Sequence, residues 1–246
     1  MIARLGMYPF AHLGDAYDTL WRVVRRHLGD GPDALDHDLD LHESWRRPDL
    51  LLGQTCGWPL VTQLLDTVTV VGAFDVRAPF AEGGRYRTVL VASKPRSVEE
   101  WKTDPDTVVA VNGPDSLSGW VSLQWAWGGV PPNVRTTGGH VLSMRAVAAG
   151  EAHLASIDAL SYEFFVESEP AVAARLHVVG HGPSVGTLPL VMANELADRR
   201  DDVRAALAAA VADADAAEAC ARLRINGFVP CGPEAYADLP GLLPTH

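Results

Sequence analysis

The sequence predicts an α/β protein in which strands alternate with crossover helices. The chain opens with a β-α-β pattern: a strand over 2–7, an amphipathic helix over 12–28 and a short buried strand over 49–52. Later in the chain, two short polar turns each open a helix. Hydrophobic residues make up 48% and charged residues 21% of the 246 residues, as expected of a folded globular chain. This length allows one or two domains.

The first third of the chain supplies the opening elements. The helix over 12–28 has an apolar face at helical spacing, formed by Leu13, Tyr17, Leu20, Trp21, Val24 and Leu28. The strand over 49–52 leads into a polar turn that contains Gln54, Thr55 and Cys56. Polar residues at this position line the crevice beyond a strand's carboxyl end in open α/β sheets. An ordinary capping turn is the competing interpretation. A helix over 58–65 and a strand over 68–73 follow.

The middle of the chain leads to the first of the two polar turns. A β-rich strand is predicted over 86–92, a short helix over 98–101 and a strand over 107–111. Tyr86 opens the first of these strands, where a tyrosine more often packs in a core. Three tryptophans follow the turn, at 120, 125 and 127, and at this density they are typical of a local core.

The two polar turns are the stretch most suggestive of chemistry. The first contains Ser116, Ser118 and Gly119, and the second covers residues 136–140, with the sequence Thr-Thr-Gly-Gly-His. The second turn opens a helix over 141–149, which is followed by a strand over 154–157 that ends in Asp158. Helix N-termini carry unpaired N–H groups and a partial positive charge. Two such termini that converge could hold a tetrahedral oxyanion without Lys or Arg, although each turn alone is more often only a cap.

The last third of the chain is helical and rich in alanine. A helix over 162–166 and a strand over 176–179 precede an extended segment over 183–191. A helical region over 194–223 follows, with Val203, Leu207 and Val211 on its inward side. Gly227 is expected to end this region as a left-handed C′ residue.

Charge and cysteine content limit the partners. The formal net charge of −11 argues against nucleic acid or an anionic membrane surface as a partner, but not against a small anion. The cysteines are Cys56, Cys220 and Cys231; at least one thiol is free, and Cys220 and Cys231 could pair or stay unlinked. No metal or cofactor is expected, and no apolar run reaches the roughly 20 residues that span a bilayer. The first residues show no signal peptide, which predicts a cytoplasmic protein as written, or a periplasmic or cell-surface one if a signal was removed.

Taken in order, these motifs resemble the phosphate, phosphite and phosphonate substrate-binding proteins of ABC importers. The residues that carry the resemblance are Gln54-Thr55-Cys56-Gly57, Tyr86, Ser116-Leu117-Ser118-Gly119, Gly139-His140 with Ser143, Ser156-Ile157-Asp158, and the segment 183–191. The resemblance implies a periplasmic-binding-protein-like fold of type II with two lobes, each a mainly parallel sheet flanked by helices. Lobe 1 would comprise 1–84 and 183–246, lobe 2 would comprise 85–182, and two crossover segments would join them.

The resemblance also implies a function and a set of site residues. The protein would capture a small oxyanion between its lobes for ABC import, as a monomer, with a transporter permease as partner. Its ligand-binding residues would be Tyr8, Gln54, Thr55, Cys56, Tyr86, Ser116, Leu117, Ser118, Gly119, His140, Ser143 and Asp158.

Each of these residues has an expected role. The hydroxyls of Ser116 and Ser118 and the amide of Gly119 would donate to the anion, together with the ring of His140. Gln54, Thr55 and Tyr86 would contact the ligand from the first lobe when the lobes close. Asp158 would either orient His140 or accept from a protonated ligand oxygen.

Two positions bear on the choice of ligand. Leu117 stands where aminoalkylphosphonate binders of the family carry a hydroxyl, and Leu188 stands where they carry a carboxylate. Phosphate, phosphite or a small alkyl phosphonate is therefore favoured, with a carboxylate or sulfonate left open.

Two other functions are compatible with the sequence. The first is a cytoplasmic ligand-sensing protein of the same fold. The second is an enzyme with Cys56 as nucleophile and His140 and Asp158 as base and orienting residue, since one fold can host several functions.

Overall fold

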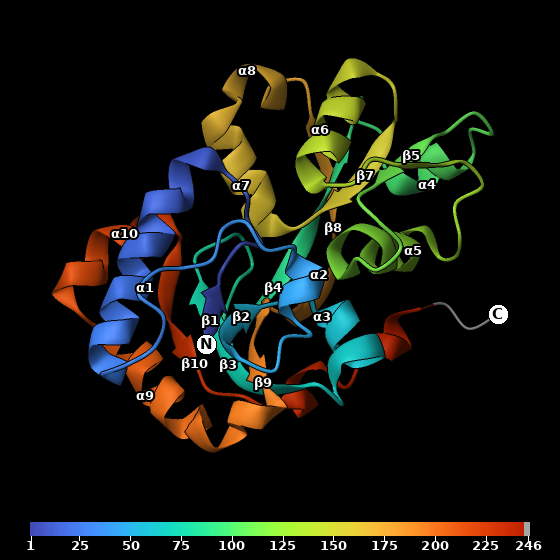
Figure 1. Cartoon of the computed structure of the whole chain (residues 1–246). Helices are drawn as coiled ribbons and strands as arrows, with labels where there is room; N and C mark the ends of the chain where they lie inside the picture. The colour runs from blue at the N-terminus through green and yellow to red at the C-terminus, as the bar shows by residue number, and fades with distance from the viewer. Residues whose placement is uncertain (244–246) are drawn as a thin grey trace. The chain divides into compact units, whose positions relative to one another are not determined.

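The computed structural model describes residues 1–243, which form two compact units (Figure 1). Unit 1 comprises Met1–Arg77, Ala81–Arg85 and Gly186–Ala237. Unit 2 comprises Ala78–Phe80, Tyr86–Val185 and the described residues from Asp238 onward. The predicted lobe bounds had placed residues from 238 onward in lobe 1, whereas residues 238–243 cluster with unit 2. The lobe bounds themselves stay a prediction.

The sheet of unit 1 is mixed. Its five strands lie in the order β1 (Ile2–Arg4), β2 (Leu50–Gln54), β9 (Pro189–Ala193), β3 (Val68–Val76) and β10 (Ile225–Val229). The pair β1–β2 is parallel, and the pairs β2–β9, β3–β9 and β3–β10 are antiparallel. A mainly parallel sheet is therefore wrong for this unit. The reason is that β3 ends where the chain leaves unit 1 at Arg77 and β9 begins where it re-enters at Gly186, so these neighbours run in opposite directions.

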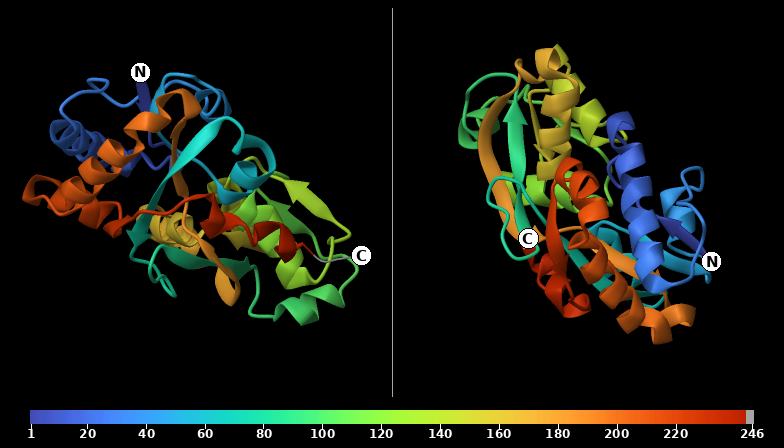
Figure 2. Two further views of the ribbon diagram at one scale, coloured as in Figure 1. Left: turned by 90° about the horizontal axis from the view of Figure 1, so that it is seen from below. Right: turned by 90° about the vertical axis from the view of Figure 1, so that its left-hand side faces the viewer.

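Helices of unit 1 pack on one another as well as on the sheet. Helix α1 (Gly14–Leu28) contacts α9 (Arg200–Val211) and α10 (Ala217–Arg222), and Figure 2 shows them side by side. The predicted apolar face of α1 is confirmed, because Leu20, Trp21 and Val24 are buried. A 3₁₀ turn precedes this helix. The unit also contains the short helices α2 (Leu41–Ser44) and α3 (Gly57–Pro59), with a π-helical segment after α3.

The end of the alanine-rich region differs from the prediction. Gly227 lies inside strand β10, and the left-handed residue after α10 is Arg224, with φ of 57°. The helix thus ends with a left-handed residue, as many helices do, but the next residues pair with β3 instead of forming a turn.

The sheet of unit 2 carries the two polar turns. Its strand order is β6 (Val134–Thr136), β5 (Val109–Val111), β7 (Leu154–Ile157), β4 (Arg85–Ala92) and β8 (His177–Gly186). Strand β5 is parallel to both β6 and β7, and β4 is antiparallel to β7. Strand β6 was not predicted, because its three residues are all exposed and show no alternation of apolar side chains. The predicted α/β class is confirmed.

Helices α4 (Val98–Lys102), α5 (Ser122–Trp127), α6 (His140–Ala149), α7 (Ala159–Ser168) and α8 (Pro170–Ala173) belong to this unit. A buried cluster that includes Trp101 and Leu123 packs on the sheet, and Trp120 and Trp127 pack against it. The expected local tryptophan core is confirmed for these two, whereas Trp125 is 44% exposed.

The parallel strands of unit 2 determine where its polar residues lie. Because β5, β6 and β7 run in the same direction, their carboxyl ends meet at one edge of the sheet. The residues that follow these strands are Asn112, Thr137 and Asp158.

The remaining sequence expectations concern cysteines, metals and membranes. All three cysteines are free thiols, so Cys220 and Cys231 are unlinked. Within residues 1–243, no group of His, Cys, Asp and Glu side chains has the geometry to hold a metal ion. No helix in that range combines the length and the apolar character needed to cross a membrane.

Candidate functional site

The first polar turn follows β5 and is closed by its own side chain. Ser116 is the N-cap of a π-helical segment, Leu117–Val121, that continues into α5. The Gly119 N–H donates to Ser116 Oγ at 2.9 Å. The predicted role of the Gly119 amide as a ligand donor is therefore wrong in this structure, because the cap already uses that N–H. Leu117 is buried.

The second polar turn is bonded to the end of β5. The N–H groups of Thr137 and Gly138 donate to the carbonyl oxygens of Val111 and Asn112, at 2.8 and 3.0 Å. Gly138 has φ of 89°, a left-handed conformation that favours glycine. Thr137 Oγ1 lies 2.7 Å from Ser143 Oγ, and Ser143 is buried. The buried Ser143 hydroxyl thus stabilises the turn through Thr137. This bond alone explains why a serine lies at position 143, without any contact to a ligand.

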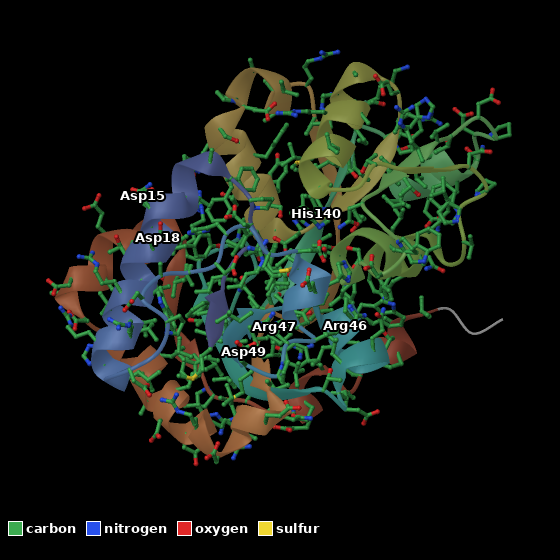
Figure 3. The ribbon with its side chains drawn as sticks, viewed as in Figure 1. Asp15, Asp18, Arg46, Arg47, Asp49 and His140 are labelled. Carbon is green, nitrogen blue, oxygen red and sulfur yellow. The ribbon has the colours of Figure 1, made fainter. Side chains whose placement is uncertain are left out.

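The two turns meet at His140, as predicted. His140 is the first residue of α6 (Figure 3), and its Nε2 atom lies 2.7 Å from Ser118 Oγ. Asn112 Nδ2 lies 3.5 Å from the same ring nitrogen. The other ring nitrogen, Nδ1, is buried and has no hydrogen-bond partner. A hydroxyl and an imidazole from different turns therefore converge on one point, where His140 Nδ1 and Asn112 Oδ1 are both buried without a partner.

Burial determines the charge state of His140. Desolvation of the ring lowers the pKa of His140, and the negative charge of Asp158 partly opposes this. The imidazole is consequently neutral at neutral pH. A neutral ring can donate through only one of its nitrogens.

Tyr86 and Asp158 form a buried pair in unit 2. The Tyr86 hydroxyl donates to Asp158 Oδ2 at 2.5 Å, and both side chains are 2% exposed. Asp158 Oδ1 accepts from the Ser161 N–H at 2.9 Å and so caps α7. The prediction that Tyr86 closes from the first lobe is wrong, since Tyr86 belongs to unit 2. Asp158 influences His140 through its charge.

Buried hydroxyls on the sheet of unit 2 hold the first turn in place. Ser156 Oγ donates to the Ser118 carbonyl oxygen at 2.6 Å and lies 3.3 Å from Thr88 Oγ1. Gly182 leaves room for this layer, because a Cβ at that position would lie 2.1 Å from Thr88 Oγ1. Sequence reasoning gave Thr88 and Gly182 no role. A strand residue and a distant glycine become neighbours only through sheet pairing.

The candidate residues of unit 1 follow its two parallel strands. Tyr8 comes after β1, and Thr55 and Cys56 come directly after β2, so they belong to the same edge of that sheet. Gln54 is the last residue of β2, which is longer than predicted. The Oε1 atom of Gln54 is buried without a hydrogen-bond partner, and Thr55 is fully buried.

Comparison with known proteins agrees with this architecture. Residues 62–236 match the family model of the periplasmic substrate-binding protein of the phosphonate ABC transporter. The chain belongs to this family. A comparison with curated proteins found no match.

Solved structures show the same fold. A binding protein component of an ABC phosphonate transporter from Pseudomonas aeruginosa is 17% identical, with a TM-score of 0.82, covering 98% of this chain and 85% of that one. PhnD1 from Prochlorococcus marinus, solved with methylphosphonate, is 14% identical, with a TM-score of 0.75, covering 98% and 96%. A Xanthomonas citri protein bound to chloride is also 14% identical, with a TM-score of 0.70, covering 98% and 95%.

The predicted resemblance and the type II fold are confirmed by these matches. The family and the first of these neighbours are described as transporter substrate-binding proteins, not as enzymes.

Proposed function

We propose that this protein captures a small phosphonate-type oxyanion for import by an ABC transporter permease. The observation that supports this most directly is the meeting of Ser118 and His140, with Oγ and Nε2 2.7 Å apart. They lie at the carboxyl edge of three parallel strands, where open α/β sheets bind ligands. No Lys or Arg is needed, because hydroxyls, an imidazole N–H and helix N-termini supply the donors.

Asp158 points to a ligand that carries a proton. Its charge acts on the ring of His140, so an oxyanion bound by His140 would also feel the carboxylate. Two negative groups repel each other unless a proton lies between them. A phosphonate, phosphite or phosphate monoanion has a P–OH group for this purpose, and sulfate has none at neutral pH.

Two leucines narrow the ligand further. Both Leu117 and Leu188 are buried and apolar, and neither offers a carboxylate or hydroxyl to an alkyl ammonium group. We therefore favour methylphosphonate or phosphite over a zwitterionic aminophosphonate.

In unit 1, Tyr8, Gln54, Thr55 and Cys56 stay predicted ligand-binding residues. The unpartnered Oε1 of Gln54 is a hydrogen-bond acceptor, so it supports a ligand role in which it takes the P–OH proton of a monoanionic ligand and not one in which it binds the charged oxygens. The protein would act as a monomer.

Two other functions receive less support. A cytoplasmic sensor is not favoured by a family described as periplasmic transporter components. An enzyme would need Cys56 together with His140 and Asp158, but the hydrogen bonds of the Asp158 carboxylate to Tyr86 and Ser161 already give that side chain a structural role.

A thermal-shift screen tests the ligand class. Binding to the folded state raises the melting temperature by mass action, so methylphosphonate, phosphite and phosphate should raise it more than an aminoalkylphosphonate, and sulfate or small carboxylates should raise it least. A shift by sulfate as large as that by methylphosphonate would contradict the argument from Asp158.

Calorimetry of Ser118→Ala tests the site. Loss of a charge-assisted hydrogen-bond network at the anion should weaken binding by about one to two decades. Ser168→Ala is the matched control, because Ser168 bonds only to main-chain oxygens near the end of α7. Equal affinities for the two variants would count against the site.

A further inference from the structure

Asn112 connects the two polar turns, although it is not among the ligand-binding residues proposed above. It is the first residue after β5, and its carbonyl oxygen accepts from the Gly138 N–H of the second turn at 3.0 Å. Its side chain reaches Gly119 of the first turn and His140 of the second. One residue therefore touches both turns that form the anion site.

The amide of Asn112 fits closely against Gly119. A Cβ atom at position 119 would lie 1.8 Å from Asn112 Oδ1, so only glycine leaves room for the amide. This contact places Oδ1 against the Gly119 backbone and leaves Nδ2 3.5 Å from His140 Nε2. Asn112 Oδ1 is buried without a partner, as is His140 Nδ1.

The hydrogen-bond chemistry of these groups limits where the ring proton can be. A carboxamide NH₂ only donates, so the nitrogen that it faces must offer a lone pair. Ser118 Oγ and His140 Nε2 are 2.7 Å apart, and a proton must lie between them. If Nε2 offers its lone pair, that proton belongs to the Ser118 hydroxyl. The single proton of the neutral ring is then on Nδ1.

We propose that Asn112 is a positioning residue that holds His140 as the Nδ1–H tautomer. In this arrangement Ser118 donates to Nε2, and the donor available to an oxyanion is the buried Nδ1–H. An N–H group enclosed without a partner is unfavourable in the free protein, and an anion oxygen would satisfy it. The ligand part of this inference rests on the proposed function; the tautomer does not.

The opposite arrangement makes a different prediction. If the amide presented Oδ1 to the ring, Nε2 would carry the proton and donate to Asn112 and Ser118. The Ser118 hydroxyl would then be free to donate to the anion, and Nδ1 would be a lone pair. The two arrangements differ in which ring nitrogen is protonated.

Nitrogen-15 NMR of the ligand-free protein distinguishes them, because protonated and unprotonated imidazole nitrogens have well-separated shifts. The signals of His140 are assigned by their loss in His140→Gln. We expect protonated Nδ1 and unprotonated Nε2 in the wild type. Asn112→Asp should move the proton onto Nε2, because a carboxylate only accepts. Asn112→Leu should give a mixture of tautomers.

Asn133→Leu is the matched control. The Asn133 amide bonds only to the main-chain oxygens of Pro105 and Thr107 in the same unit, so its loss should leave the His140 signals unchanged. A wild-type spectrum with the proton on Nε2 would overturn the inference by itself. An unchanged spectrum in Asn112→Asp would also overturn it.

Calorimetry with methylphosphonate then separates this inference from the proposed function. Asn112→Asp should weaken binding by about tenfold or more. The ring would then present the lone pair of Nδ1 to the anion, and the new carboxylate would repel it. Absence of methylphosphonate binding to the wild type would contradict the proposed function and leave the tautomer result intact. Unchanged affinity in Asn112→Asp would contradict the role of Asn112 in binding.

Discussion

The candidate residues of the two units differ in how they are held. In unit 2 they bond to one another across the sequence, Ser118 to His140 and Tyr86 to Asp158. In unit 1, Gln54, Thr55 and Cys56 are consecutive, and the Oε1 atom of Gln54 is enclosed without a hydrogen-bond partner. Each unit keeps an unsatisfied buried atom, His140 Nδ1 in unit 2 and Gln54 Oε1 in unit 1. The comparison teaches that in unit 2 another candidate side chain, Ser118, already orients the residue that carries this atom.

This difference has energetic consequences. Groups that are already oriented lose little freedom when a ligand binds, which favours affinity. An unsatisfied buried polar atom costs about 1–3 kcal/mol of stability, and it is tolerated where function uses it. Substitutions of the candidate residues in unit 2 should therefore reduce both stability and ligand affinity. Substitution of Gln54 should reduce ligand affinity without reducing stability.

The largest effect is expected for Gly119→Ala. The new methyl group would lie 1.8 Å from Asn112 Oδ1, so the amide and then His140 must move. We expect a loss of about 1–3 kcal/mol in the free energy of unfolding, as for overpacked cores, and loss of detectable oxyanion binding. Urea denaturation and calorimetry measure the two effects.

Gly14→Ala controls for the exchange of glycine for alanine, because a Cβ there meets nothing within 4 Å and the residue is helical. Similar unfolding free energies for Gly119→Ala and the wild type would show that the Asn112 amide is not tightly held.

Tyr86→Phe should have the next largest effect on stability. It removes the hydroxyl that donates to Asp158 Oδ2 in a buried setting. We expect a loss of about 1–3 kcal/mol in unfolding free energy, the usual cost of a buried acceptor left without its partner. Tyr162→Phe, in the same unit and less buried, is the comparison variant. Equal stabilities of the two variants would argue that the pair contributes little.

His140 should make stability depend on pH. Its folded-state pKa lies below the value of about 6.5 for an unfolded chain. As pH falls below that value, the unfolded chain binds a proton that the folded protein does not. The free energy of unfolding therefore decreases toward acid, by at most about 1.4 kcal/mol per pH unit from this group.

Above neutral pH both states are uncharged at this position and the contribution disappears. Urea denaturation at pH 7 and pH 5 should show a smaller acid loss in His140→Gln than in the wild type. His177→Gln, at an exposed position, controls for the removal of one histidine. Equal acid losses in His140→Gln and the wild type would contradict the burial argument.

The smallest effect on stability is expected for Gln54→Leu. The change removes a buried amide oxygen that has no partner, so the free energy of unfolding should stay within about 0.5 kcal/mol or rise. Oxyanion binding should nevertheless weaken, which calorimetry measures. A large loss of stability with unchanged affinity would make Gln54 a structural residue and would end the contrast between the two units.

Local patterns in the sequence were sufficient for several elements and for the meeting of the turns. The apolar face of α1, the strand at Leu154–Ile157 and the cap at Ser116 all follow from spacing and residue type. The order of the motifs was sufficient for the family. These properties depend on residues that are close in sequence or on their order along the chain.

The tertiary structure decided what these residues do for one another. The Tyr86–Asp158 bond and the contact of Asn112 with His140 join residues 72 and 28 positions apart. The close fit of Asn112 against Gly119 likewise depends on how the turn after β5 folds back. Hydrogen bonds between distant side chains require a particular sheet order and register, and short-range residue patterns do not specify these. The sequence alone therefore determined that two polar turns share a sheet edge, and only the packed structure determined which donors the turns use among themselves and which they leave for a ligand.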